Sequence, residues 1–184
     1  MNTDAIRCEG LDLVLMTPAF IERLLANDDD GAERELGVRL GVRRWAEPDA
    51  AVLVLRLAQV RAEPAAAPWL LRAIVLPDRT MIGHAGFHGP PDADGYAELG
   101  YTVFAPFRRR GYARAAATCL MRWAGREHGV RRFRLSIGPE NTASLALAES
   151  LAFRRTGEQM DEVDGLEWIF TREGAPAPVP PSER

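Results

Sequence analysis

A turn rich in arginine and glycine, directly ahead of an amphipathic helix, is the part of this sequence best suited to binding an anion. Arg108, Arg109 and Arg110 lead to Gly111. After it, small and apolar residues recur at the spacing of one helix face: Ala113, Ala116, Ala117, Leu120, Met121 and Ala124. The first N–H groups of a helix have no intrahelical partner, and the helix dipole gives them partial positive charge. Gly111 lets a ligand approach this backbone without a Cβ in the way, so the stretch predicts an anion site.

Two familiar phosphate-binding loops are excluded by their spacing. A Walker A loop needs G-x-x-x-x-G-K-[ST], and the chain contains no lysine at all. A dinucleotide loop needs G-x-G-x-x-G after a strand, and this pattern does not occur. What remains is the hexapeptide Arg108-x-x-Gly111-x-Ala113.

The composition predicts one folded domain over residues 1–173, followed by a Pro-rich, disordered tail over 174–184. A chain of 184 residues, 47% of them hydrophobic, can bury a sizeable core. No apolar run approaches the length of a membrane span, and residues 1–10 lack the apolar stretch of a secretion signal. We therefore expect a cytoplasmic protein without a membrane partner. The net charge of −3 also disfavours a nucleic-acid partner.

The two cysteines, Cys8 and Cys119, lie far apart and form no metal or redox spacing. This predicts reduced thiols. Cys119 falls beside the apolar stripe of its helix, which favours a structural thiol over a nucleophile.

Apolar periodicity and turn residues predict alternating strands and helices. The expected elements are a strand over 10–16, a helix capped by Thr17 with Pro18 at its first position, helices over 32–40 and 50–62, strands over 69–76, 80–88 and 96–104, the helix from Gly111 to Gly129, a strand over 130–137, a helix over 142–151 and a hairpin over 153–160 and 166–171. The run 50–55 could equally be a buried strand.

Local signals support several of these elements. The acidic stretch 27–30 is expected to form a solvated turn that caps the next helix, and Asp49 and Asn141 are expected to cap the helices that follow them. Asp164-Gly165 predicts a tight hairpin turn. The connection from strand 96–104 through a helix to strand 130–137 predicts that these two strands are parallel.

This order of elements resembles the GNAT superfamily, the acyl-CoA-dependent N-acyltransferases. Arg108-x-x-Gly111-x-Ala113 resembles its [QR]-x-x-G-x-[GA] pyrophosphate loop. Glu98-Leu99-Gly100-Tyr101 resembles the E-[IL]-G-Y of the branch that includes ribosomal-protein alanine N-acetyltransferases. Asn141-x-x-Ser144 with Leu151-Ala152-Phe153 and Gly157 resembles N-x-x-S…L-G-F…G. Over about residues 10–173, the resemblance implies an α/β (α+β) fold with a central, mixed, mostly antiparallel twisted sheet of six to seven strands and helices on both faces.

The resemblance also implies acetyl-CoA as the acetyl donor, with no metal. The pyrophosphate would be held beside Arg108 by backbone amides of Arg109, Arg110, Gly111, Tyr112 and Ala113. Strand backbone at Val103 and Phe104 would pair with the pantetheine. Asn141 would hydrogen-bond the pantetheine arm, and Ser144 would lie near the thiol.

The reaction implied is direct attack of an amine on the acetyl thioester, without a covalent enzyme intermediate. An alkylammonium is mostly protonated at neutral pH, so a base must remove a proton, and Glu98 is the first candidate. Glu98 could instead be an edge carboxylate paired with an arginine. His84 and His88, four residues apart on one strand face, could line the acceptor cleft or replace Glu98 as the base.

One departure from the family pattern concerns the leaving thiolate. The tyrosine that many members use as a general acid is replaced here by Ala148. The thiolate would then leave unassisted or take its proton from Tyr101 or water. The expected acceptor is a small-molecule or peptide amine, and the chain is a monomer or homodimer. The alternative is a catalytically weak acyl-CoA-binding module with a regulatory or partner-binding role.

Overall fold

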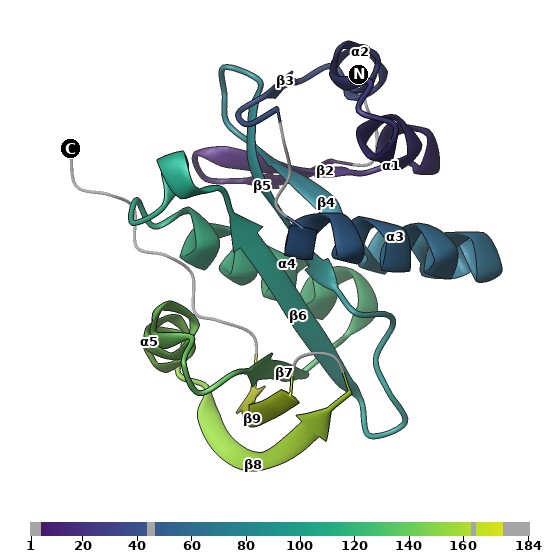
Figure 1. Cartoon of the computed structure of the whole chain (residues 1–184). Helices are drawn as coiled ribbons and strands as arrows, with labels where there is room; N and C mark the ends of the chain where they lie inside the picture. The colour runs from purple at the N-terminus through teal and green to yellow at the C-terminus, as the bar shows by residue number, and fades with distance from the viewer. Residues whose placement is uncertain (1–4, 44–46, 163–164, 175–184) are drawn as a thin grey trace.

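In the computed structural model of this chain, residues 5–43, 47–162 and 165–174 are described. Within these ranges, nine strands form one sheet in the order β1-β2-β4-β5-β6-β7-β9-β8, with β3 beside β5 (Figure 1). The strands are β1 Ala5–Cys8, β2 Leu11–Leu15, β3 Arg39–Leu40, β4 Arg72–Val75, β5 Thr80–Phe87, β6 Tyr96–Val103, β7 Arg132–Ile137, β8 Arg154–Asp161 and β9 Gly165–Glu173. The expected seven strands all occur. The sheet is larger than the six to seven strands predicted, because the short β1 and β3 carry no clear apolar alternation.

The helices bear out most of the sequence signals. They are α1 Pro18–Leu25, α2 Asp29–Leu36, α3 Glu47–Ala62, α4 Tyr112–His128 and α5 Thr142–Ser150. Thr17 caps α1, Asp28 caps α2 and Asn141 caps α5, each through its side chain. The run 50–55 is helical.

Three boundaries differ from the prediction. Helix α2 begins at Asp29 and ends at Leu36, with Gly37 as its C-cap, so it does not reach residue 40. Helix α3 begins at Glu47, so Asp49 lies inside the helix and is not its N-cap. Strand β4 begins at Arg72 and not at residue 69, because Trp69 is the last residue of a 3₁₀ helix, Pro64–Trp69, that precedes the strand.

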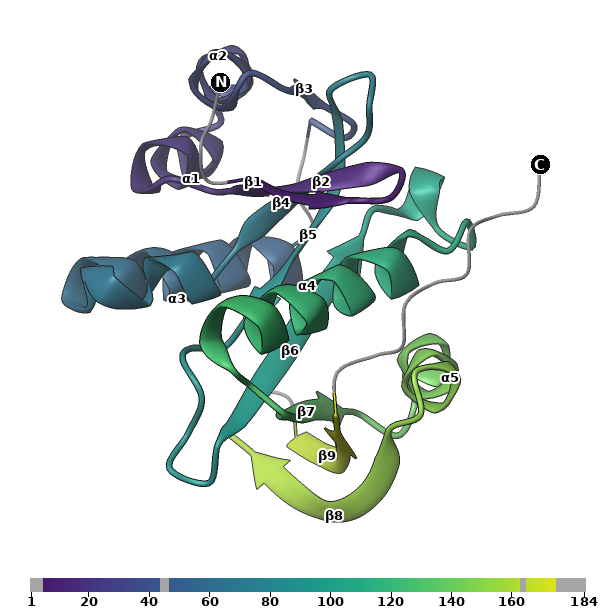
Figure 2. The same cartoon turned by 180° about the vertical axis from the view of Figure 1, so that it is seen from behind.

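Helices cover both faces of the sheet, as expected (Figures 1 and 2). Helices α1, α2 and α3 pack over one face, around Phe20, Leu53 and Met81. Helices α4 and α5 pack over the other, where Leu120 and Met121 are fully buried. Burial of the α4 stripe confirms the helix periodicity, although Ala113 at its first turn is only partly buried.

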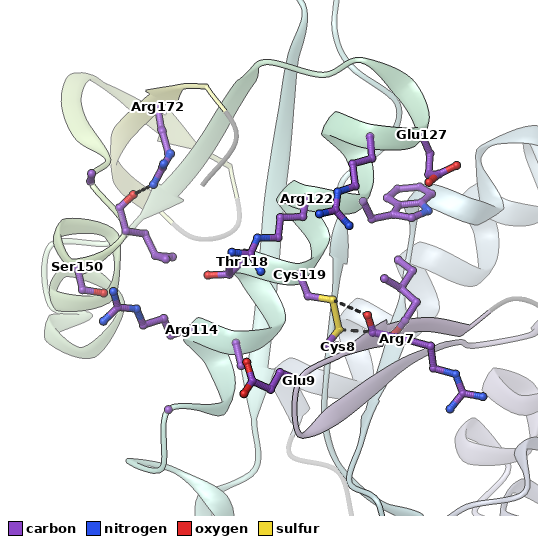
Figure 3. A pocket seen from close by; sticks show the side chains of 17 residues that line it. Arg7, Cys8, Glu9, Arg114, Thr118, Cys119, Arg122, Glu127, Ser150 and Arg172 are labelled. Atoms are coloured by element: carbon purple, nitrogen blue, oxygen red, sulfur yellow. Dashed lines mark hydrogen bonds between the residues drawn. A yellow bond between two sulfur atoms is a disulfide. The ribbon is translucent and has the colours of Figure 1, made fainter. Parts of the chain in front are cut away.

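The prediction of two reduced thiols is wrong for this structure. Cys8 and Cys119 form a disulfide that joins β1 to the middle of α4 (Figure 3). The two residues meet because β1 pairs with β2 at the sheet end over which α4 passes. This long-range approach leaves no trace in cysteine spacing.

The C-terminal region follows the prediction where it is described. Strands β8 and β9 form an antiparallel hairpin, with Asp161 opposite Gly165. Asp164 of the predicted turn and residues 175–184 of the predicted tail lie outside the described residues. Within the described ranges, no helix is both long enough and apolar enough to cross a bilayer.

Candidate active site

The first turn of α4 is open and lacks a side-chain cap. Gly111, at the N-cap position, has a φ of +81°, and no side chain in the described ranges caps the helix. The first intrahelical bond reaches Gly111 O from Ala115 N, at 3.0 Å. The earlier amides, those of Tyr112, Ala113 and Arg114, therefore have no intrahelical acceptor. A Cβ added at Gly111 would meet no described atom within 4 Å, so the space above these amides is clear.

The arginines before Gly111 shape this turn in different ways. Arg108 Nε donates to Val103 O at 2.8 Å, which ties the turn to the end of β6. Arg109 has a positive φ of 62°, which turns the chain toward the helix. The residues at 109, 110 and 111 are exposed. The turn therefore presents positive charge and free amides to solvent, as the sequence predicts for an anion site.

Next to this turn, strands β6 and β7 separate. They pair in parallel at only three positions, residues 96–98 with 132–134, as the βαβ connection predicts. Beyond that, residues 99–103 of β6 and 135–137 of β7 have no ladder partner on their facing sides. We call the space between these two segments the strand gap. A cavity of about 540 Å³ occupies it, with Tyr101, Ser136, Asn141 and Ser144 in its walls.

Backbone groups of β6 face the strand gap at alternate residues. His88 N donates to Glu98 O at 2.8 Å, and Phe104 N donates to Ile82 O at 2.9 Å, so the even-numbered residues bond to β5. The odd-numbered Leu99, Tyr101 and Val103 therefore turn their backbone groups toward β7. Phe104, in contrast, uses its N–H in the sheet and its carbonyl to accept from Phe107 N. Of the two strand residues predicted to pair with pantetheine, only Val103 faces the gap.

Glu98 lies in a polar network at the closed end of the strand gap. Ser136 Oγ donates to Glu98 Oε1 at 2.7 Å, and Arg134 lies 3.9 Å from Oε2. His88 Nδ1 lies 3.4 Å from Oε1. Glu98 itself is not among the described residues that line the cavity, whereas His88 and Ser136 are. His88 and Ser136 therefore lie between the predicted base, Glu98, and the cavity.

The two histidines have different surroundings. His84 is buried within β5, with 4% of its surface exposed. His88 follows β5, and its side chain is 47% exposed. The carbonyl of His88 accepts hydrogen bonds from Arg56 and Gln59 of α3. In the part of the chain that the structure describes, no group of three metal-ligating side chains comes together.

A second cavity, of about 710 Å³, follows the outer side of α4 (Figure 3). Its wall begins at Gly111 and carries Arg114, Arg122 and Arg126 along the helix. Arg114, Ser150 and Arg172 lie on the α5 side of the helix, and the disulfide lies on the β1 side. The turn therefore opens into a groove whose wall includes five arginines and two glutamates, Glu9 and Glu127.

The acetyltransferase (GNAT) domain model matches residues 38–154 of this chain. The chain belongs to the GNAT acetyltransferase family. It is similar to the N-acetyltransferase YjdG of Bacillus subtilis (strain 168), itself uncharacterized, with 26% identity over 157 residues, which cover 83% of this chain and 88% of that protein. Among solved structures, a protein of Bordetella pertussis assigned to the GnaT family superposes with a TM-score of 0.65 at 23% identity, covering 91% of this chain and 98% of that one.

A second similar structure is RimL, the ribosomal L7/L12 α-N-protein acetyltransferase, solved in complex with coenzyme A. It superposes with a TM-score of 0.63 at 14% identity, covering 93% of this chain and 98% of RimL. At this identity the similarity concerns the fold. It agrees with the GNAT fold expected from the sequence.

Ala148 occupies the position of the tyrosine in the GNAT pattern, and Tyr101 is the candidate proton donor in its place. Ala148 lies on the buried face of α5 and is not among the described residues that line the cavity. Tyr101 does line it, close to Ser144. Burial raises the pKa of the Tyr101 hydroxyl above its ordinary value, and the Ser144 side chain offsets part of that rise. This hydroxyl is buried and forms no hydrogen bond of ordinary geometry with the described residues.

Replacing Tyr101 by phenylalanine should lower the kcat of thiol release by about tenfold, because a protonated phenol assists thiolate departure. The raised pKa keeps the hydroxyl protonated throughout the neutral range, so the loss should not vary between pH 6 and about 9. Steady-state kinetics across that range test this. Tyr96→Phe is the control, because its ring lies under Arg132 and Arg134, away from the cavity wall. Equal rates for the two variants would remove Tyr101 as the acid.

Sequence reasoning missed the supports of Glu98. No expectation from the sequence includes the hydrogen bond from Ser136 to Glu98. The parallel register that places residues 132–134 beside 96–98 would have indicated it. Arg56 and Gln59 of α3 donate hydrogen bonds to the carbonyl of His88, and no pattern in the sequence indicates that these segments meet.

Proposed function

We propose that this chain transfers the acetyl group of acetyl-CoA to a primary amine of a small molecule or a peptide N-terminus, by direct attack in a ternary complex. The observation that carries the proposal is the uncapped first turn of α4 beside the strand gap. Helices α1, α2 and α5 are each capped by a side chain, whereas the N-terminus of α4 is open to solvent. A pyrophosphate at this turn would supply the missing acceptors.

Coenzyme A would occupy the turn and the strand gap together. Amides of Tyr112, Ala113 and Arg114 would hold the pyrophosphate, with Arg109 and Arg110 neutralising its charge. The pantetheine would lie along β6 as an added strand, bonding to backbone groups of residues 99 and 101 and to the N–H of Val103, whose carbonyl accepts from Arg108. RimL, which shares this fold, is solved in complex with coenzyme A.

The far end of the pantetheine would place the thioester near the cavity walls formed by Tyr101 and Ser144. Asn141 Oδ1 accepts from Ser144 N at 3.1 Å as the cap of α5, which leaves the Asn141 side-chain NH₂ to donate to the pantetheine. The acceptor amine would arrive near Glu98, whose carboxylate attracts an ammonium and favours its approach. We also propose a cytoplasmic location.

Thiol release tests this function directly. The wild-type protein should bind coenzyme A in calorimetry and should release free thiol from acetyl-CoA when spermidine, benzylamine or a peptide with a free N-terminus is added. Mass spectrometry of the acceptor should show one added acetyl group. Binding of coenzyme A without thiol release in any mixture would support the non-catalytic module. Absence of coenzyme A binding would contradict both functions.

A further inference from the structure

The imidazole of His88 lies between the Glu98 carboxylate and the cavity of the strand gap. Its Nδ1 lies 3.4 Å from Glu98 Oε1. Its Nε2 lies over β6, 3.0 Å from the position that a Cβ on residue 100 would occupy. His88 and Gly100 both line the cavity, whereas Glu98 does not. The ring therefore has one nitrogen on the carboxylate and the other beside the cavity.

We propose that His88 Nε2 accepts the proton of the acceptor ammonium, and that Glu98 acts through His88 as a positioning residue. This inference rests on the proposed acetyl transfer. A carboxylate beside Nδ1 favours the tautomer with the proton on Nδ1, which leaves the lone pair on Nε2. The same carboxylate stabilises the imidazolium once Nε2 has taken a proton.

Gly100 is the residue that admits the ring. A Cβ at this position would lie 3.0 Å from Nε2, so any other residue would force the imidazole to shift by a few tenths of an ångström. The glycine of Glu98-Leu99-Gly100-Tyr101 thus has a physical role here. Because Gly100 has no side chain, the imidazole of His88 can lie directly against the β6 backbone.

The charges around His88 come from three elements. Glu98 on β6 favours the protonated ring, whereas Arg56 on α3 disfavours it. Arg134 on β7 bonds Asp92 at 3.0 Å and lies 3.9 Å from Glu98, so it draws on the same carboxylate. Burial and Arg56 together lower the pKa of His88 below its ordinary value of 6.5. The ring is therefore neutral at pH 7, which is the state that a base requires.

The proposed step balances as follows. The ammonium gives one proton to His88 Nε2, and the freed lone pair attacks the thioester carbonyl to form the C–N bond. The C–S bond breaks as the tetrahedral intermediate collapses. The second nitrogen proton goes to the departing thiolate, through Tyr101 or water. The His88 imidazolium then returns its proton to solvent, through the exposed part of its side chain.

His88→Gln should lower kcat at pH 7 about 10²–10⁴-fold, the usual contribution of a general base. Because only free amine can then react, the remaining rate should rise about tenfold per pH unit up to the pKa of the acceptor. Wild-type kcat should instead be flat above pH 6.5. Gly100→Ala, which only shifts the ring, should lower kcat by less than His88→Gln does. His128→Gln, at the far end of α4, is the control and should match the wild type.

Nuclear magnetic resonance gives a test that does not depend on turnover. The chain has three histidines, so comparison with His88→Gln assigns the His88 ring signals. In Glu98→Gln, the His88 pKa should fall further, because the carboxylate that raises it is gone. An unchanged pKa in that variant, or a His88→Gln variant within threefold of wild-type kcat, would overturn the proposal and return the role of base to Glu98. If the wild type releases no thiol with any amine, the proposed function fails instead.

Discussion

Reducing the disulfide between Cys8 and Cys119 should lower the free energy of unfolding by about 4–5 kcal/mol. The bond spans 111 residues, and a loop of about 100 residues restricts the unfolded chain by about that amount in the chain-entropy account. Urea unfolding with and without dithiothreitol measures the difference. The double variant Cys8→Ser/Cys119→Ser is the control, because the reductant should leave its midpoint unchanged.

The same experiment bears on location. Disulfides are rare in cytosolic proteins, where thiol buffers keep cysteines reduced, so the bond and the proposed cytoplasmic location favour opposite redox states. Coenzyme A affinity should be equal in both states, because Cys119 lies about two helical turns from Gly111. Identical urea midpoints for the oxidised and reduced wild type would show that the bond contributes nothing to stability.

Placing aspartate at position 111 should weaken coenzyme A binding at least about 100-fold, or about 2.7 kcal/mol. The carboxylate would lie at the N-terminus of α4, where it accepts from the free amides and repels the pyrophosphate. The φ of +81° favours glycine, but Asn and Asp tolerate this region better than other side chains. The variant should therefore fold.

Gly111→Asn is the matched control, since it has the same shape without the charge. We expect it to weaken binding about tenfold by partial occupation of the same amides. Calorimetric titration with coenzyme A at two salt concentrations separates the effects, because salt screens only the charge difference. If both variants bind coenzyme A as tightly as the wild type, the pyrophosphate does not lie at this turn.

The sequence predicted those features that depend on neighbours along the chain. Thr17 and Asn141 were correctly identified as caps, because a cap needs only a suitable side chain and an amide three residues later. The prediction that Asp49 caps α3 is wrong, because the sequence allows this helix to begin either before Pro48 or after Asp49. Pro48 is tolerated in the first turn of a helix, where its missing N–H has no partner to lose, so the helix begins before the aspartate.

Features that depend on distant segments were predicted only where topology constrained them. The parallel pairing of β6 and β7 followed from the βαβ rule. The Cys8–Cys119 bond and the contact of Arg56 with His88 did not, since each joins elements whose relative placement no local pattern encodes. For the same reason the sequence leaves open whether Glu98 or a histidine is the base, because the position of His88 beside the cavity depends on tertiary packing.

The short pairing between β6 and β7 also has a consequence for amide hydrogen exchange. Only three residue pairs join the two halves of the sheet, so β7, β8 and β9 should exchange their amides through local opening more readily than β4 and β5. A bound pantetheine would lie between β6 and β7 and would add hydrogen bonds to the backbone of β6. Protection gained at residues 99, 101 and 103 when coenzyme A is added would therefore map the ligand onto the strand, without any enzymatic assay.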